Sequence, residues 1–285
     1  MKSTKDLQIT DISPPKGWAA LNIKELYDNR ELLYFFVWRD IKVKYKQTLL
    51  GVAWTVIVPL ANTIVFTLLF GKLAKLPTDG LPQPVFYMAG LVIWKYFSST
   101  LSSVSNSLTG NTALLTKIYF PRLLLPLSTC ILGLLDFIIA FAALILLMLY
   151  CRTLPATTIV FIPFFVLIAI GTALGIGLFF AALNVKYRDV KSLVPFFIQL
   201  WMYCSVIAPF SMLPKDLGTW RYLYGLNPMA GVIEGFRWSL MHNIPGATVQ
   251  NPFILIAIGL PVLITMLIFG FYYFKRVENQ FADII

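Results

Sequence analysis

The chain has 285 residues, of which 58% are hydrophobic and only 13% are charged, and its mean hydropathy is +0.77. This composition excludes a sizeable water-soluble domain and predicts an integral membrane protein. The net charge of +10 is expected beside membrane spans, where basic residues favour the cytoplasmic side and anionic lipid, so we infer no nucleic-acid binding. The three cysteines are odd in number and lie in or beside apolar runs, so we expect neither a disulfide framework nor a metal site.

The N-terminal part divides into a tail and an amphipathic segment. Residues 1–20 are mostly polar and include two consecutive prolines, and we expect a mobile tail. From 21 to 50, apolar residues recur at helical spacing between charged ones. This pattern predicts a helix that lies in the membrane interface rather than crossing it. The helix is either a simple anchor or a surface whose polar face also touches a cytoplasmic partner.

Residues 51–285 are predicted to form an all-α transmembrane domain. Apolar runs predict six spans, at roughly 51–70, 85–105, 123–149, 157–183, 192–212 and 253–274. Both termini then lie in the cytoplasm, and most Lys and Arg residues fall on that side, in agreement with the positive-inside bias. In this scheme Lys95 is counted among the outer charges.

The segment 213–252 is long for a loop and apolar enough to return to the bilayer. Asn227 and Pro228 form a strong helix start, a capping residue and then a first-turn proline. The apolar run that follows is too short to span, which is typical of a re-entrant or interfacial helix. Glu234 and Arg237 lie three apart on this helix and can pair. The pair is either an ordinary surface ion pair or a polar edge turned toward a water-filled mouth.

Residues that could carry chemistry are sparse. The fragment Gly71-Lys72-Leu73 lacks the upstream glycine and the following Ser or Thr of a phosphate-binding loop. Asp136, near the middle of the third predicted span, should face protein or water rather than lipid. It is either a residue of a transport path or a group that hydrogen-bonds between helices. We favour the structural role, because no second acidic residue sits in a span to form a proton relay.

Aromatic residues make up 15% of the chain, and many belong to the interfacial belts common in membrane proteins. Some lie well inside two predicted spans, where their faces could stack on sugar rings. These candidate channel residues are Trp54 and Phe66 in the first span and Phe196, Phe197, Trp201 and Tyr203 in the fifth. An aromatic residue in a span is more often a packing or lipid-facing residue, so both interpretations stay open.

Four stretches stand out together, in order along the chain. They are WRDIKVKYKQTLLGVAWTVIVPL at 38–60, KIYFPRLLLPLS at 117–128, NVKYRDVK at 184–191 and LNPMAGVIEGFRWSL at 226–240. Each is weak alone, but the four in a six-span chain of this length resemble the ABC-2 family of permeases. The resemblance is greatest to the membrane subunits that export lipid-linked polysaccharide such as O-antigen, capsule or teichoic acid.

The resemblance implies a half-transporter of the bacterial cytoplasmic membrane. Two copies would form a central channel as a homodimer, and two copies of a separate ATP-binding subunit would dock below. That subunit would hold ATP and Mg, while this chain would need no cofactor and would not be an enzyme. The substrate would be a lipid-linked glycan, and membrane lipid would be a further partner.

The resemblance also assigns roles to residues. The amphipathic helix and a cytoplasmic helix at 106–122 would contact the ATP-binding subunit. The contact residues would be Arg39, Lys42, Leu114, Leu115, Lys117, Tyr119 and Arg122. The gate near the outer mouth would include Asn227, Pro228, Glu234 and Arg237, and the aromatic residues of spans one and five would line the channel.

Three other functions compete with this one. An ABC-2 exporter of a drug or of another lipid would share the fold. A membrane transferase that uses a polyprenyl lipid should show clustered Asp, Glu or His at a membrane face, which the sparse Asp136 and Glu234 do not supply. A passive channel should show a selectivity ring, and the sequence has no evident one.

Overall fold

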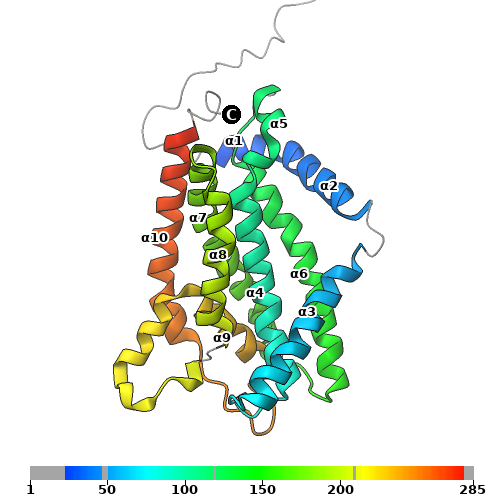
Figure 1. Cartoon of the computed structure of the whole chain (residues 1–285), viewed down its shortest axis with the longest axis vertical. Coiled ribbons are helices and arrows are strands. Elements are labelled where there is room, and N and C mark those ends of the chain that lie inside the picture. The colour runs from blue at the N-terminus through cyan, green and yellow to red at the C-terminus, as the bar shows by residue number, and fades with distance from the viewer. Residues whose placement is uncertain (1–22, 47–50, 118–119, 208–209, 279–285) are drawn as a thin grey trace, which may run out of the picture.

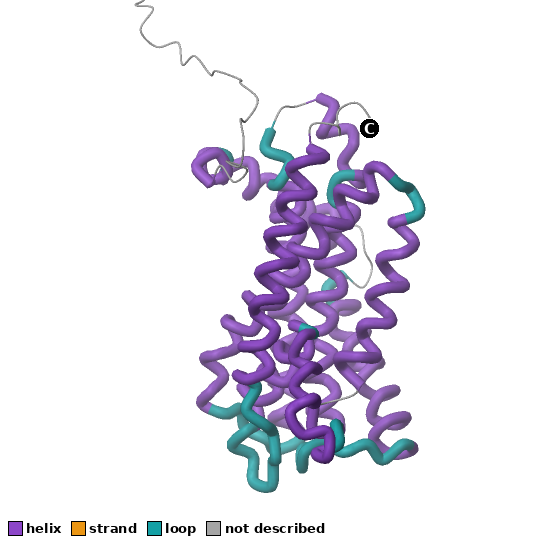
Figure 2. The backbone as a smooth tube through the Cα atoms, turned by 90° about the vertical axis from the view of Figure 1, so that its left-hand side faces the viewer, coloured by secondary structure: helices purple, strands orange, loops and turns teal. Residues whose placement is uncertain are grey.

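The computed structural model describes residues 23–46, 51–117, 120–207 and 210–278. Every regular element in those ranges is a helix (Figure 2), as predicted. The predicted tail 1–20 and the end of the interface segment lie outside the described residues. The long elements are α2 Arg30–Lys46, α3 Ala53–Phe66, α4 Gln83–Asn106, α6 Leu124–Tyr150, α7 Ile162–Lys186, α8 Val190–Met202, α9 Pro228–Met241 and α10 Phe253–Glu278. The shorter ones are α1 Ile23–Asp28, η2 Thr67–Leu73, η3 Thr109–Asn111, α5 Thr112–Lys117, η4 Thr157–Phe161, η5 Tyr203–Ile207, η6 Phe210–Met212 and η7 Lys215–Leu226.

Four helical segments among the described residues are long and apolar enough to cross a membrane. They are Ala53–Leu73, Leu124–Tyr150, Thr157–Lys186 and Phe253–Glu278. The predicted spans at 85–105 and 192–212 are not among these four, one because of its polarity and the other because of its length. With 24 residues α4 is long enough, but it carries many polar side chains, whereas Val190–Val206 is apolar but short.

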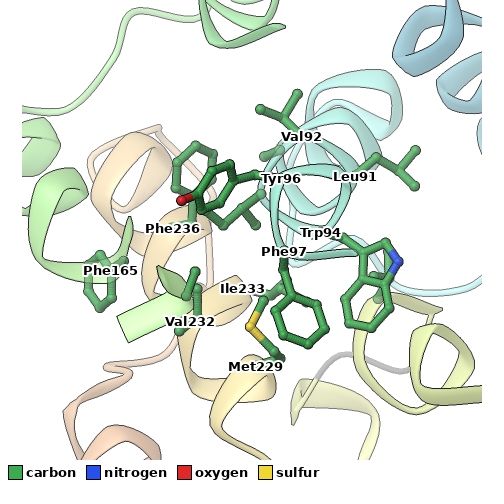
Figure 3. Packing of buried hydrophobic residues seen from close by; sticks show 14 of the residues in the cluster. Leu91, Val92, Trp94, Tyr96, Phe97, Phe165, Met229, Val232, Ile233 and Phe236 are labelled. Carbon is green, nitrogen blue, oxygen red and sulfur yellow. The ribbon is translucent and has the colours of Figure 1, made fainter. Parts of the chain in front are cut away.

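Helix α4 lies at the centre of the bundle, with α6 and α7 packed along it (Figure 1). From Val85 to Phe97 nearly all its side chains are buried. Large apolar residues of α4 pack on α9 and α7, where Phe97 lies near Met229 and Ile233 (Figure 3). Other helices therefore cover most of the circumference of α4, and a side of α4 that they leave exposed is a candidate functional surface.

Helices α7 and α10 approach each other at small residues. A Cβ atom at Gly270 would overlap the carbonyl oxygen of Gly175, and a Cβ atom at Gly175 would lie 2.9 Å from the α10 backbone. Small residues allow such close backbone contact between membrane helices. Gly175 and Gly270 therefore allow α7 and α10 to pack in direct backbone contact.

A second core closes the end of the bundle where α1, α2 and α5 lie (Figure 1). Phe36 of α2 is buried there, with its ring edge-on to Phe120 at 5.3 Å. On the other side of α2, Tyr34, Phe35 and Trp38 are exposed. The predicted interface helix therefore has one apolar face on the protein and a second that is free for lipid.

Candidate functional site

One side of α4 is polar along half of its length. The residues concerned recur at intervals of three and four, which places them on one face of the helix. They are Lys95, Ser98, Ser99, Ser102, Ser103 and Asn106, here called the polar stripe. Lys95 and Ser103 are exposed and the others are half-buried, although the surrounding residues of α4 are mostly buried. The sequence-based search for channel residues considered aromatic side chains only and missed this stripe.

All residues of the polar stripe except Asn106 lie on the floor of a groove of about 630 Å³ between α3, α4 and α8. Helices α3 and α8 flank α4 in Figure 1. Ligand pockets are of comparable size, about 300 to 1,000 Å³. The α3 wall consists of Val58, Pro59 and Asn62, and the α8 wall of Pro195, Ile198, Gln199 and Met202. The groove therefore combines apolar walls with hydroxyl, amide and ammonium groups.

Two serine hydroxyls and the amide of Asn106 in the stripe bond back to their own helix. Ser98 Oγ and Ser99 Oγ donate to the carbonyl oxygen of Lys95 at 3.2 and 2.7 Å, and Asn106 Nδ2 donates to the carbonyl oxygen of Ser102 at 2.8 Å. Such bonds satisfy the donors within an apolar medium and leave oxygen lone pairs free to accept. The groove can therefore exchange hydrogen bonds with a ligand that carries many hydroxyl groups.

Lys95 lies near the middle of α4, not at its outer end. It follows Gln83 by twelve residues and precedes Asn106 by eleven, so it is about 16 to 18 Å from either end of the helix. The earlier count of Lys95 among the outer charges is wrong. A lysine at the centre of a membrane helix costs about 2.5 to 3.5 kcal/mol on insertion scales, and such residues usually have a functional role.

The predicted channel aromatics separate into two groups. Trp201 packs in its own chain, with its ring 4.9 Å from that of Phe97 and 5.3 Å from that of Phe197. Its Nε1 donates to Asn227 Oδ1 at 2.8 Å. Phe66 is also packed, with its ring centroid 6.2 Å from that of Tyr87. These contacts give Trp201 and Phe66 a packing role in the single chain.

The other predicted channel aromatics point outward. Trp54 is 54% exposed, Phe196 is 62% exposed and Tyr203 is 49% exposed. Phe197 belongs to both groups, because its ring packs on that of Trp201 and is also partly exposed. Leu193 and Leu200 extend the exposed side of α8. This apolar edge of the groove is covered by no described part of the chain.

Helices α2 and α5, which carry most of the residues predicted to contact an ATP-binding subunit, lie at one end of the bundle (Figure 1). Arg39 is engaged within the chain, because it pairs with Asp40 and donates from Nη2 to Asn111 Oδ1 at 3.0 Å. Arg122 donates to the carbonyl oxygen of Glu278 at the end of α10.

The remaining predicted contact residues differ in exposure. Leu114 and Leu115 are half-buried against the second core, while Lys42 and Lys117 are exposed. Tyr119 lies outside the described residues. The exposed lysines are therefore the members of this set with the most surface available to a partner.

The predicted helix start at Asn227 is confirmed. Asn227 Oδ1 accepts from Met229 N at 3.1 Å, and Pro228 is the first residue of α9. Asn227 also donates from Nδ2 to Ser205 Oγ at 2.8 Å. Together with the bond from Trp201, these contacts join the start of α9 to the fifth predicted span.

The environment predicted for Glu234 and Arg237 is wrong in both versions. They do pair, at 3.3 Å, but Arg237 is 0% exposed and Glu234 is 6% exposed, so the pair is neither on the surface nor beside water. The guanidinium lies 3.8 Å from the centroid of Phe86, and it packs close to Gly90, where an added Cβ would lie 2.7 Å from Arg237 Nη2.

The buried pair also forms hydrogen bonds with backbone groups near the end of the fifth predicted span. Arg237 Nη2 donates to the carbonyl oxygen of Val206 at 3.2 Å, and Glu234 Oε1 accepts from Phe210 N at 3.2 Å. Unpaired backbone groups are costly inside a membrane protein. The ion pair therefore holds α9 against η5 and η6.

Asp136 has the structural role that was favoured. Its carboxylate accepts a hydrogen bond from Tyr45 OH at 2.6 Å and forms an ion pair with Lys44. Both partners belong to α2, so Asp136 fixes the end of the interface helix to α6. No group of three or more metal-ligating side chains occurs among the described residues.

Comparison with known protein families matches residues 31–241 to the family described as "ABC-2 type transporter". The "O-antigen export system permease protein RfbA" of Myxococcus xanthus is 29% identical over 228 residues, which cover 79% of this chain and 86% of the relative. A protein of that name from Klebsiella pneumoniae is 28% identical over 268 residues, which cover 93% of this chain and 97% of the relative.

A third relative is the "Polysialic acid transport protein KpsM" of Escherichia coli, which is 26% identical over 209 residues, 71% of this chain and 78% of the relative. These matches confirm the predicted resemblance and the prediction of a transport permease rather than an enzyme. The chain has several candidate membrane spans, which identifies it as a multi-pass membrane protein. Because the family match covers most of its length, the protein belongs to the ABC-2 type transporter family.

Proposed function

We propose that this chain is the membrane-spanning half of an ATP-driven exporter that moves lipid-linked polysaccharide across the bacterial cytoplasmic membrane. Two copies would face each other, and their grooves would form one channel. The observation that carries this proposal is the groove between α3, α4 and α8, because its floor presents hydroxyl groups and its walls present two amides in an otherwise apolar chain. A glycan needs such partners to replace the water that it loses in the membrane.

The edges of the groove support a second copy as its cover. The outward side of α8 carries Phe196, Leu200 and Tyr203, and that of α3 carries Trp54 and Ile57, all exposed in the single chain. Contact between two such edges would enclose the polar stripe and remove it from lipid. The names of the relatives support the substrate class, since they describe export of O-antigen and transport of polysialic acid.

The energy would come from a separate ATP-binding subunit, because the sequence has no phosphate-binding loop pattern. That subunit would dock at the end of the bundle with α2 and α5, where Lys42 and Lys117 are exposed. In this proposal the bundle has six spans, with α4 and α8 as the second and fifth. Both termini are cytoplasmic, and α9 is a re-entrant helix near the outer mouth.

The test makes the floor of the groove apolar. The double variant Ser99→Leu/Ser102→Leu should lose glycan export in proteoliposomes that contain the ATP-binding subunit, because the substrate loses its hydrogen-bonding partners. Membrane insertion and assembly with that subunit should be retained. The control is Thr265→Leu, which also replaces a hydroxyl side chain by leucine, on the exposed side of α10, and which should export normally.

Normal export by the double variant would refute the groove as the substrate path. Loss of export by Thr265→Leu as well would show only a general intolerance of added bulk. A wild-type chain that exports no glycan when combined with its ATP-binding subunit would refute the proposed function itself.

A further inference from the structure

We propose that Lys95 is an anion-binding residue that holds the phosphate groups of the lipid-linked substrate at the middle of the groove. This inference rests on the proposed function and adds a substrate-recognition residue to it. Its basis is the juxtaposition of an exposed ammonium group, the serines of the stripe, and the amides of Asn62 and Gln199 on the opposite walls.

Lys95 has no counter-charge in the described part of the chain. The ion pairs found there use Arg39, Lys44, Arg237 and Lys275 as the basic partners. The mid-span acidic residue Asp136 is already paired with Lys44. An ammonium that lies far from either end of the bundle without a counter-charge is unfavourable, so an anion from outside the chain is the partner that the site lacks.

The side chain cannot reach water at either end of the bundle. Both ends of α4 are about 16 to 18 Å away along the helix, and four methylene groups cover only a fraction of that length. The lysine is therefore fixed in the groove, where its environment must be polar for the chain to be stable. The serines, Asn62 and Gln199 make it so.

The position of Lys95 within the stripe indicates which part of a substrate it would meet. The stripe extends from Asn106, toward the α5 end of the bundle, to Lys95 about 16 Å away. Beyond Lys95 the same side of α4 is apolar, with Leu91 and Trp94 lining the groove. A phosphorylated headgroup that moved along the polar stripe from the α5 end would thus reach the ammonium group of Lys95 where the stripe ends.

A phosphate fits this site better than a neutral sugar does. A charged donor and an anionic acceptor form stronger hydrogen bonds than neutral groups do. The amides of Asn62 and Gln199 can donate to further phosphate oxygens, whereas the serines between Lys95 and Asn106 are suited to sugar hydroxyls. In a homodimer, each copy would contribute one lysine to the shared channel.

The test measures binding of undecaprenyl diphosphate and of undecaprenol to the full-length chain in nanodiscs. The two lipids share the hydrocarbon tail and differ in the anionic group. The variants are Lys95→Met, which keeps the length without the charge, Lys95→Arg, which keeps the charge, and Lys72→Met as a control at an exposed lysine outside the groove. Inorganic diphosphate serves as a competitor that has no lipid.

Wild type should bind the diphosphate lipid more tightly than the alcohol. Lys95→Met should lose about 10- to 100-fold in affinity for the diphosphate lipid, or about 1.4 to 2.8 kcal/mol, and bind the alcohol as before. Lys95→Arg should restore most of the affinity, and Lys72→Met should bind like wild type. Inorganic diphosphate at high concentration should compete with the diphosphate lipid for wild type, and a complete lack of competition would overturn the assignment of the binding to the anionic group.

Equal binding of the diphosphate lipid by wild type and Lys95→Met would overturn the inference. So would equal binding of the two lipids by wild type. Neither result would touch the proposed function, which is judged separately by glycan export with the ATP-binding subunit. Because Lys95→Met removes a charge from the membrane, we expect this variant to fold at least as well as wild type.

Discussion

The buried ion pair of α9 offers the sharpest test of the packing described above. In Arg237→Met, Glu234 stays buried without its partner, and Val206 and Phe86 lose the guanidinium that contacts them. Removal of one member of a buried pair costs about 3 to 5 kcal/mol. On the scale of domains of about 150 to 250 residues, this loss corresponds to a fall of roughly 6 to 20 °C in apparent melting temperature.

The assay is thermal unfolding of the purified full-length chain in detergent, followed by the loss of the monodisperse species. The double variant Glu234→Gln/Arg237→Met should recover part of the loss, because it leaves no buried charge and Gln can still accept from Phe210. Lys72→Met, at an exposed position, should melt like wild type. The reasoning is refuted if Arg237→Met melts within about 2 °C of wild type, less than 1 kcal/mol on that scale.

Three further predictions concern other contacts. Gly270→Ala should lower the melting temperature, because its Cβ would overlap the Gly175 carbonyl, whereas Gly110→Ala, with nothing within 4 Å, should not; equal melting of the two variants would contradict the packing. Asp136→Asn should release the end of α2, seen as faster backbone hydrogen exchange there without global unfolding; unchanged exchange would show that the ion pair does not hold the helix. Lys117→Glu should reduce ATP-driven export while insertion is retained, and normal coupling would remove this residue from the proposed dock.

Much of the helical framework could be predicted from the sequence because hydropathy dominates it. The apolar runs at 123–149 and 253–274 correspond closely to α6 and α10, and the start of α9 followed from the capping chemistry of Asn227 and Pro228. The environment of Arg237 could not be predicted in this way. Whether a pair at three-residue spacing faces water or protein depends on neighbours distant in the sequence, here Phe86 and Val206.

The candidate site was predicted only in part, for two different reasons. The separation of packed Trp201 from exposed Tyr203 depends on what α4 presents to α8, which local sequence does not show. The polar stripe was within reach, because the three- and four-residue spacing from Lys95 to Asn106 is visible in the sequence. A search for polar periodicity inside a predicted span, rather than for aromatic residues alone, would have found it.

The central claim, that the groove is the substrate path, can be tested by the accessibility of single cysteines to a membrane-impermeant maleimide. The background replaces Cys130, Cys151 and Cys204, and the variants are Ser99→Cys in the groove and Ile138→Cys on an exposed apolar side of α6. In transporter actively exporting glycan, Ser99→Cys should be labelled and then protected by excess lipid-linked glycan, while Ile138→Cys stays unlabelled. An export-competent Ser99→Cys variant that is labelled no faster than Ile138→Cys would contradict the account.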